Sequence, residues 1–293
     1  MTMRRTRFDA IGTKWDIQIQ DKLSEDDWLA LLQKLYVRIQ AFDKAYSRFR
    51  SDSLVTQLAE QGGRHELPAD GYKLLEFYER LYRATDGKVT PLIGQAMVDA
   101  GYDADYSLES GELTPPPLWD DSIAYSYDAI TLKQPALLDF GAAGKGYLVD
   151  IVAGVIAAAG VEHYLVNAGG DIINRLQGGL LRVGMENPRN TTEVIGIVEL
   201  GSRSLCGSSG SKRAWGDFHH IIDPEQLAAA TDVLATWVIA NDTMTADGLA
   251  TALFFVDPSR LSANFQFEYA ILYPDMSLQQ TPQFNAQTFG AEA

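Results

Sequence analysis

A glycine-rich segment in the middle of the chain has a pattern that suits a phosphate. Residues 138–150 read LDFGAAGKGYLVD, an apolar run that ends in a glycine turn before a helical pattern begins. Such a turn exposes free backbone N–H groups, which favour an anion together with the helix dipole. Lys145 is followed by Gly146 and the glycine spacing is short, so neither a Walker A loop nor a dinucleotide fingerprint is present. A tight turn with a solvated Lys145 explains the pattern equally well.

A second segment, residues 244–253, carries oxygen ligands at helical spacing. Asp247 and Thr251 stand at positions i and i+4, so a helix places them on one face. A carboxylate, a hydroxyl and carbonyl oxygens form a hard donor set that suits Mg²⁺ and not Zn²⁺. The pattern alone favours the simpler alternative, an Asp near a helix N-terminus and a Thr bonded back to a carbonyl.

Two adjacent histidines, His219 and His220, could supply a general base, and they are half of the four histidines in the chain. Neighbours in a strand point to opposite faces, so only one of them faces a given site and the other is structural. The same geometry disfavours a metal site made of this pair. Asp223 follows closely and could orient the base.

A pair of glycines, Gly169 and Gly170, follows a strand-like run and precedes Asp171. The glycines permit a positive φ or a close backbone approach to a ligand, and Asp171 could cap or orient groups there. The pattern alone favours a plain turn.

The elements that must position these residues alternate between strands and helices, which predicts an α/β or α+β core. A capping-box-like start at Ser24 predicts a long amphipathic helix with apolar positions from Trp28 to Phe42. A loop over 104–127 with three prolines is the best seam between subregions, and a polar tail begins at 277. We expect helices at 71–84, 147–159 and 243–255. We expect strands at 8–20, 129–132, 137–140, 163–167, 180–185, 194–200, 218–222, 232–240 and 267–273.

The composition excludes several classes of partner. The 293 residues include 24 Lys and Arg against 39 Asp and Glu, a formal charge of −15, which argues against nucleic acid and an anionic membrane. A small polyanion remains compatible if local N–H groups, a Lys or a metal overcome this field. Cys206 is the only cysteine, so an intrachain disulfide and a Cys-rich zinc site are excluded. No apolar run predicts a transmembrane segment or a secretory signal, which leaves a cytoplasmic location or a removed leader.

Taken in order, the segments resemble the ApbE family of flavin transferases over roughly residues 8–273. The matching segments are 8–15, 46–53, 85–94, 139–150, 165–172, 209–210, 220–224 and 246–254. The resemblance implies one domain over 1–293 with two lobes, a T-fold-like α/β architecture and FAD in the cleft between the lobes. It also implies Mg²⁺-dependent transfer of FMN from FAD to a Thr or Ser hydroxyl of an acceptor protein, with release of AMP. The alternatives are an FAD pyrophosphatase that yields FMN and AMP, and a non-catalytic FAD-binding carrier or sensor.

The resemblance also implies roles for individual residues. His220 matches the family's proposed catalytic histidine, with Asp223 beside it and Lys145 neutralising the leaving charge or orienting the glycine turn. Thr90 stands where many members have Asp, which bears on the choice between transfer and hydrolysis. The implied FAD contacts are Ile11, Phe49, Lys88, Val89, Thr90, Gly141, Tyr147 and Ile222. The implied metal ligands are the Gly144 carbonyl, Asp247, the Ala250 carbonyl and the Thr251 hydroxyl.

Overall fold

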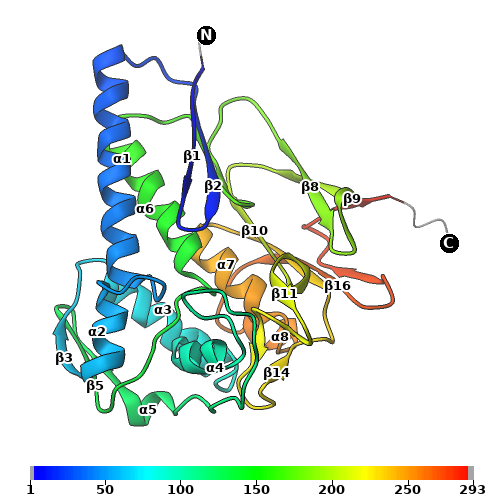
Figure 1. Cartoon of the computed structure of the whole chain (residues 1–293). Helices are drawn as coiled ribbons and strands as arrows, with labels where there is room; N and C mark the ends of the chain where they lie inside the picture. Colours follow the sequence, from blue (N-terminus) through cyan, green and yellow to red (C-terminus); the bar gives the residue numbers. More distant parts are fainter. Residues whose placement is uncertain (1–2, 290–293) are drawn as a thin grey trace.

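An eight-stranded, wholly antiparallel sheet forms the centre of the computed structural model, which describes residues 3–289 (Figure 1). Its strands lie in the order β1-β2-β6-β7-β10-β15-β16-β17. Their bounds are β1 Arg4–Ala10, β2 Thr13–Ile19, β6 Tyr164–Ala168, β7 Asp171–Asn174, β10 Ser204–Ser209, β15 Ala235–Ala240, β16 Glu268–Leu272 and β17 Leu278–Gln280.

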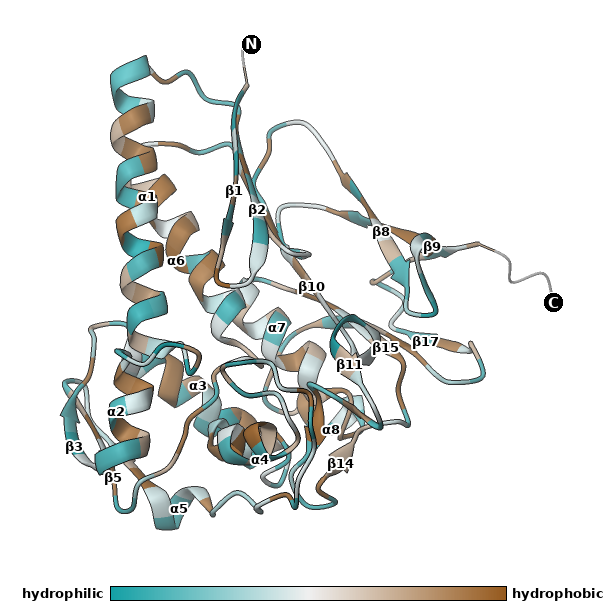
Figure 2. Ribbon diagram, viewed as in Figure 1, coloured by the Kyte–Doolittle hydropathy of each residue, from teal (hydrophilic) through white to brown (hydrophobic). Residues whose placement is uncertain are grey.

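Helices cover one face of this sheet. α6 (Gly144–Ala158) packs on β6 and β7, and α7 (Thr243–Ala252) packs on β10 and β15. The long helix α1 (Glu25–Tyr46) lies against α6, and Figure 2 shows hydrophobic and hydrophilic residues alternating along it. Ser24 caps α1 by accepting a hydrogen bond from the Asp27 N–H, as the sequence predicts.

The opposite face of the sheet packs against a smaller sheet of β8 (Leu181–Asn187), β9 (Asn190–Leu200) and β18 (Gln287–Thr288). Both faces of the central strands are therefore buried, and successive side chains along each strand point alternately to the helices and to the smaller sheet. Val166 and Val238 belong to the core on the helix side, whereas Leu165 and Ile239 belong to the core under the smaller sheet.

The remaining elements lie outside these two sheets. Three short strands, β3-β5-β4, form a separate antiparallel sheet, and α3 lies against α7. No helix within residues 3–289 is long and apolar enough to cross a membrane. The bounds are α2 Leu54–Gln61, β3 Gly63–Glu66, α3 Gly71–Ala84, η1 Pro91–Ile93, α4 Gly94–Asp99, α5 Trp119–Ser122, β4 Ile123–Tyr125, β5 Ala129–Leu132, η2 Gly210–Arg213, β11 Ala214–Trp215, β12 Phe218–His219, β13 Ile222–Asp223, β14 Ala228–Ala229 and α8 Pro258–Ser262.

The sequence predicts the class of fold and several elements correctly. The helix over 71–84 is confirmed with the same bounds as α3, and the antiparallel sheet makes the core α+β rather than parallel α/β. The loop over 104–127 is partly confirmed: 104–118 holds neither helix nor strand, but α5 and β4 follow. A boundary between lobes at this loop stays a prediction. The tail from 277 holds β17 and β18 and buries Phe284, while 290–293 lie outside the described residues.

Three predicted strands are wrong. The strand over 218–222 is two separate short strands, β12 and β13, with a bend at His220 between them. The strand over 8–20 is a hairpin, because Ile11 (φ 45°) and Gly12 (φ 69°) turn the chain between β1 and β2. The segment 137–140 pairs with no strand: its Asp139 N–H donates to the Pro91 carbonyl instead. The following helix begins at Gly144 rather than at 147, so Lys145 lies in its first turn.

The contact between α6 and α7 generates a stability prediction. A Cβ at Gly146 would lie 2.3 Å from the Thr243 carbonyl oxygen and 2.6 Å from Asp247 Cβ. We therefore expect Gly146→Ala to lower the free energy of unfolding by about 1–3 kcal/mol through overpacking, measured by urea denaturation.

The matched control is Gly154→Ala in the same helix, where an added Cβ meets nothing within 4 Å. This variant should be neutral or stabilising by up to about 1 kcal/mol, because alanine is the better helix former. Equal effects of the two substitutions would contradict the close approach of the helices.

Candidate functional site

Two adjoining cavities, of about 240 and 400 Å³, lie at the glycine turn. Thr13, at the start of β2, and Gly169, in the β6–β7 turn, line the smaller one, whereas Ile11 and Gly12 line the larger one. Together they form an elongated space whose wall combines parts of the chain that are far apart in sequence. The residues that line both cavities are Phe49, Tyr102, Asp139, Gly141, Lys145 and Arg213.

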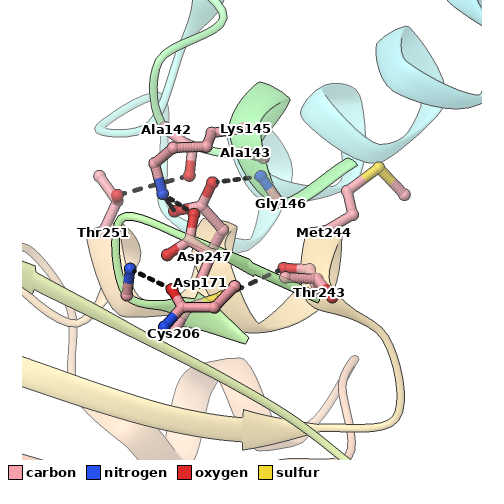
Figure 3. Close-up of polar contacts among 12 residues, drawn as sticks. Ala142, Ala143, Lys145, Gly146, Asp171, Cys206, Thr243, Met244, Asp247 and Thr251 are labelled. Carbon is pink, nitrogen blue, oxygen red and sulfur yellow. Dashed lines mark hydrogen bonds and ion pairs between the residues drawn. The ribbon is translucent and has the colours of Figure 1, made fainter. Parts of the chain in front are cut away.

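A cluster of three charged side chains lies at the smaller cavity, which two of them, Lys145 and Asp247, line (Figure 3). The Asp247 carboxylate accepts a hydrogen bond from the Gly146 N–H at 2.8 Å, which fixes it at the start of α6. The Lys145 ammonium forms an ion pair with Asp171 and lies 3.9 Å from Asp247 Oδ1. Both carboxylates are buried, at 1% exposure for Asp171 and 4% for Asp247. The structure thus brings together three of the segments that the sequence singled out.

Thr251 extends this cluster with neutral oxygens. Its hydroxyl donates to the Ala142 carbonyl at 3.5 Å, and Ala142, Asp247 and Thr251 all line the smaller cavity. Burial raises the pKa of Asp247, while the Lys145 ammonium and the Gly146 N–H oppose that shift. A carboxylate, a hydroxyl and a carbonyl oxygen are the donors that Mg²⁺ prefers, so these residues fit a hard divalent cation.

The two carbonyl ligands implied by the resemblance, those of Gly144 and Ala250, stay predictions. Gly144 lines the larger cavity, and the carbonyl that Thr251 contacts belongs to Ala142. The Ala250 carbonyl accepts a buried hydrogen bond from the Thr236 hydroxyl at 2.6 Å. Ala250 as a ligand stays a prediction. No group of three or more His, Cys, Asp or Glu side chains in the described part of the chain is arranged to hold a metal, so any metal here needs neutral oxygens.

The two histidines have different surroundings, but strand geometry is not the reason, because β12 ends at His219 and His220 lies in the bend that follows. His219 is held by backbone on both ring nitrogens: Nε2 lies 2.9 Å from the Ala230 carbonyl, and Nδ1 accepts from the Ile221 N–H at 3.1 Å. His220 lines the smaller cavity, and its buried Nδ1 has no hydrogen-bond partner. Burial, followed by the nearby Arg213 guanidinium, lowers the pKa of His220 to about 3, so the ring is neutral at pH 7.

Asp223 does not orient His220 by a hydrogen bond, which corrects the sequence-based expectation. Its two carboxylate oxygens accept from Lys88 Nζ at 2.8 and 2.9 Å, and the Glu225 N–H donates to it as well. Burial raises the pKa of Asp223, but the hydrogen bonds from Lys88 and the backbone outweigh burial and lower it. Asp223 therefore holds Lys88, which lines the smaller cavity.

Most of the predicted FAD contacts lie on the cavity walls. Ile11 lines the larger cavity, and Phe49 and Gly141 line both. Tyr147 lines neither: its ring packs in the core against Phe42, and its hydroxyl donates to the Asp70 carbonyl at 3.1 Å. The predicted contacts on the smaller cavity alone are Lys88, Val89, Thr90 and Ile222.

Sequence reasoning missed several cavity residues. Arg48 is buried and donates from Nε to Asp139 at 2.5 Å, and its guanidinium stacks over the Phe49 ring at 4.2 Å. Arg213 lines both cavities and donates to the Tyr102 hydroxyl at 3.0 Å. Arg48 lies within a segment of the family resemblance, whereas no local pattern marks Arg213.

Comparison with known proteins identifies the class. The model of the ApbE family matches residues 11–270, and the chain belongs to this family. Among curated relatives, the FAD:protein FMN transferase of Haemophilus influenzae is 28% identical over 253 residues, which cover 77% of this chain and 70% of the relative. The FAD:protein FMN transferase of Treponema pallidum is 25% identical over 275 residues, covering 83% and 76%.

Solved structures agree with the fold. The ApbE protein of Thermotoga maritima superposes with a TM-score of 0.85 at 21% identity and covers 97% of this chain and 98% of its own. The flavin transferase ApbE of Vibrio cholerae gives a TM-score of 0.78 at 20% identity, with 96% of each chain covered. The mixed helix–strand architecture predicted from the sequence is therefore confirmed.

The neutral, half-buried His220, whose Nδ1 is fully buried, makes stability depend on pH. Its pKa falls from 6.5 to about 3 on folding, so the unfolded chain binds more protons and stability decreases as the pH falls below about 6.5. The free energy of unfolding of the wild type should fall between pH 7.5 and pH 5. In His220→Gln this fall should be smaller by about 1–2 kcal/mol. Urea denaturation of both proteins at the two pH values measures the difference, and an unchanged loss in the variant would refute a buried neutral ring.

Proposed function

We propose that this chain is an FAD:protein FMN transferase, which moves the FMN part of FAD to a Thr or Ser hydroxyl of an acceptor protein and releases AMP. Membership of the ApbE family and the names of the relatives support the reaction. The observation that carries the proposal is the cavity that combines the oxygen donors of Asp247 and Thr251 with the unpartnered ring of His220.

The shape and charge of the cavities suit FAD. Two adjoining spaces offer an elongated site, and aromatic rings of Phe49 and Tyr102 line both. In the smaller cavity, basic side chains outnumber carboxylates despite the overall charge of −15. The basic residues there are Lys88, Lys145, Lys212 and Arg213, against Asp139 and Asp247. A pyrophosphate would thus meet several cationic donors on the cavity wall, of which Lys88, Lys145 and Lys212 are each paired with a carboxylate that does not line the cavity.

We place a Mg²⁺ at Asp247, Thr251 and the Ala142 carbonyl, in preference to the Gly144 carbonyl, because these three line one cavity and the hydroxyl contacts that carbonyl. When bound, the ion neutralises charge on the pyrophosphate and stabilises the leaving phosphate. The Gly146 N–H holds Asp247 in position for this task.

His220 is the general base of the proposed reaction. The acceptor hydroxyl oxygen forms a bond to the phosphorus of the FMN half, and the bond from that phosphorus to the bridging oxygen breaks. The hydroxyl proton passes to His220, and AMP leaves with the electron pair. The ring is neutral and its Nδ1 is free to accept. A pyrophosphate beside it raises the pKa of His220, because a nearby anion favours the imidazolium form.

The histidine pair tests this assignment. His220→Ala should lower the rate of FMN transfer about 10²–10⁴-fold, the usual contribution of a general base. His219→Ala should retain most activity once folded, because both ring nitrogens of His219 bond to backbone. AMP release and flavin fluorescence of a Thr-containing acceptor, separated on a denaturing gel, give the rates. The reverse order of effects would overturn the roles of the two rings.

The oxygen donors give a second test. Asp247→Asn and Thr251→Val should each raise the Mg²⁺ concentration needed for half-maximal AMP release at least tenfold, because each removes a hard ligand. Release of AMP without any acceptor would identify the hydrolase alternative. FAD binding with no AMP under any divalent metal would identify a carrier instead of an enzyme.

A further inference from the structure

We propose that Asp171 is a positioning residue that holds the Lys145 ammonium away from Asp247 and so keeps Asp247 open to the divalent cation. This inference rests on the proposed function, because it assumes that Asp247 binds a metal. It assigns a purpose to a buried carboxylate that is neither a cavity-lining residue nor part of the proposed donor set.

The β6–β7 hairpin fixes the place of Asp171. Gly169 and Gly170 have φ values of 64° and 104°, which form a tight turn between Ala168 and Asp171, the last pair of the ladder. The Asn167 side chain accepts from the Gly170 N–H at 2.9 Å and secures the turn. Asp171 is therefore the first residue of β7, a central strand that packs against α6, and Figure 3 shows it close to Asp247.

Burial requires a cationic partner for Asp171. An ionised carboxylate at 1% exposure is costly unless it is paired, and the Lys145 ammonium forms that pair. Lys145 needs the anion as well, because it lies in the first turn of α6, where the helix dipole disfavours a positive charge. The Asp171 carboxylate and the Lys145 ammonium therefore stabilise each other at the start of α6.

Asp247 is the second carboxylate within reach of the same ammonium. Lys145 Nζ lies 3.9 Å from Asp247 Oδ1, at the limit of an ion pair and farther away than its closer partner Asp171. With Asp171 ionised, the three side chains carry a net charge of −1, which attracts a divalent cation. Without the Asp171 charge, the Lys145 ammonium has Asp247 as its remaining partner, and the net charge of the cluster is zero. The ammonium then competes with the metal for the Asp247 carboxylate.

The test measures metal affinity without catalysis. Mn²⁺ alone is titrated into the full-length protein, and free Mn²⁺ is followed by electron paramagnetic resonance. Asp171→Asn, which preserves shape, should raise the Kd for Mn²⁺ at least tenfold. Adding Lys145→Met to it should restore the Kd to within about threefold of the wild type, because no ammonium is left to compete.

A control variant tests whether the change in Kd comes from the Asp171 charge in particular or from the loss of any carboxylate in this part of the fold. Asp150→Asn removes a half-buried carboxylate, which accepts from the Thr243 and Met244 N–H groups at the start of α7 at 2.8 Å and lies outside both cavities. It should leave the Kd within about twofold of the wild type. If Asp171→Asn does not fold, Lys145→Met alone decides the matter: the proposal requires an equal or lower Kd, and a higher Kd contradicts it.

The outcomes distinguish this inference from the proposed function. A wild-type Kd that Asp171→Asn leaves unchanged, or a double variant as weak as the single one, would overturn the role of Asp171 and leave the metal site intact. A wild-type protein that binds no Mn²⁺ would overturn the metal site and the role of Asp171 together.

Discussion

The close approach of α6 to α7 is the constraint on which the site depends. Gly146 has no side chain, so the first turn of α6 lies directly against the backbone of Thr243. The Gly146 N–H also donates a hydrogen bond to the buried carboxylate of Asp247. This single contact sets the glycine turn beside α7. It brings the Ala142 carbonyl to the Thr251 hydroxyl and places Lys145 between two carboxylates.

The central sheet supports this contact from below. β7 supplies Asp171 at the end of a tight hairpin, while β10 and β15 form the surface on which α7 rests. The polar groups of the site thus lie on rigid elements, which favours precise placement of ligands. Basic side chains concentrate on the walls of the smaller cavity despite the net charge of −15, and most of them are paired with carboxylates that do not line it.

The sequence predicts those parts of the site that depend on local geometry. The i, i+4 spacing places Asp247 and Thr251 on one cavity wall. His219 is bound by backbone and His220 lines the cavity, but a bend after β12 separates them, not strand alternation. The bounds of α3 also follow from local apolar spacing and the turn at Asp86.

Long-range partners are not encoded in any local pattern. Lys88 and Asp223 are 135 residues apart, so the expected pairing of Asp223 with the neighbouring His220 is wrong. Arg48 and Asp139 are 91 residues apart. The strand predicted for 137–140 fails for a related reason: apolar alternation cannot tell a paired strand from an extended segment whose backbone bonds to a loop.

The most direct measurement of the central claim is a crystal structure of the protein with FAD and Mn²⁺, using the anomalous signal to locate the metal. The account predicts a Mn²⁺ peak bound by Asp247, Thr251 and the Ala142 carbonyl, with the pyrophosphate beside it and His220 facing the phosphorus of the FMN half. A peak elsewhere, or FAD bound outside the two cavities, would contradict it.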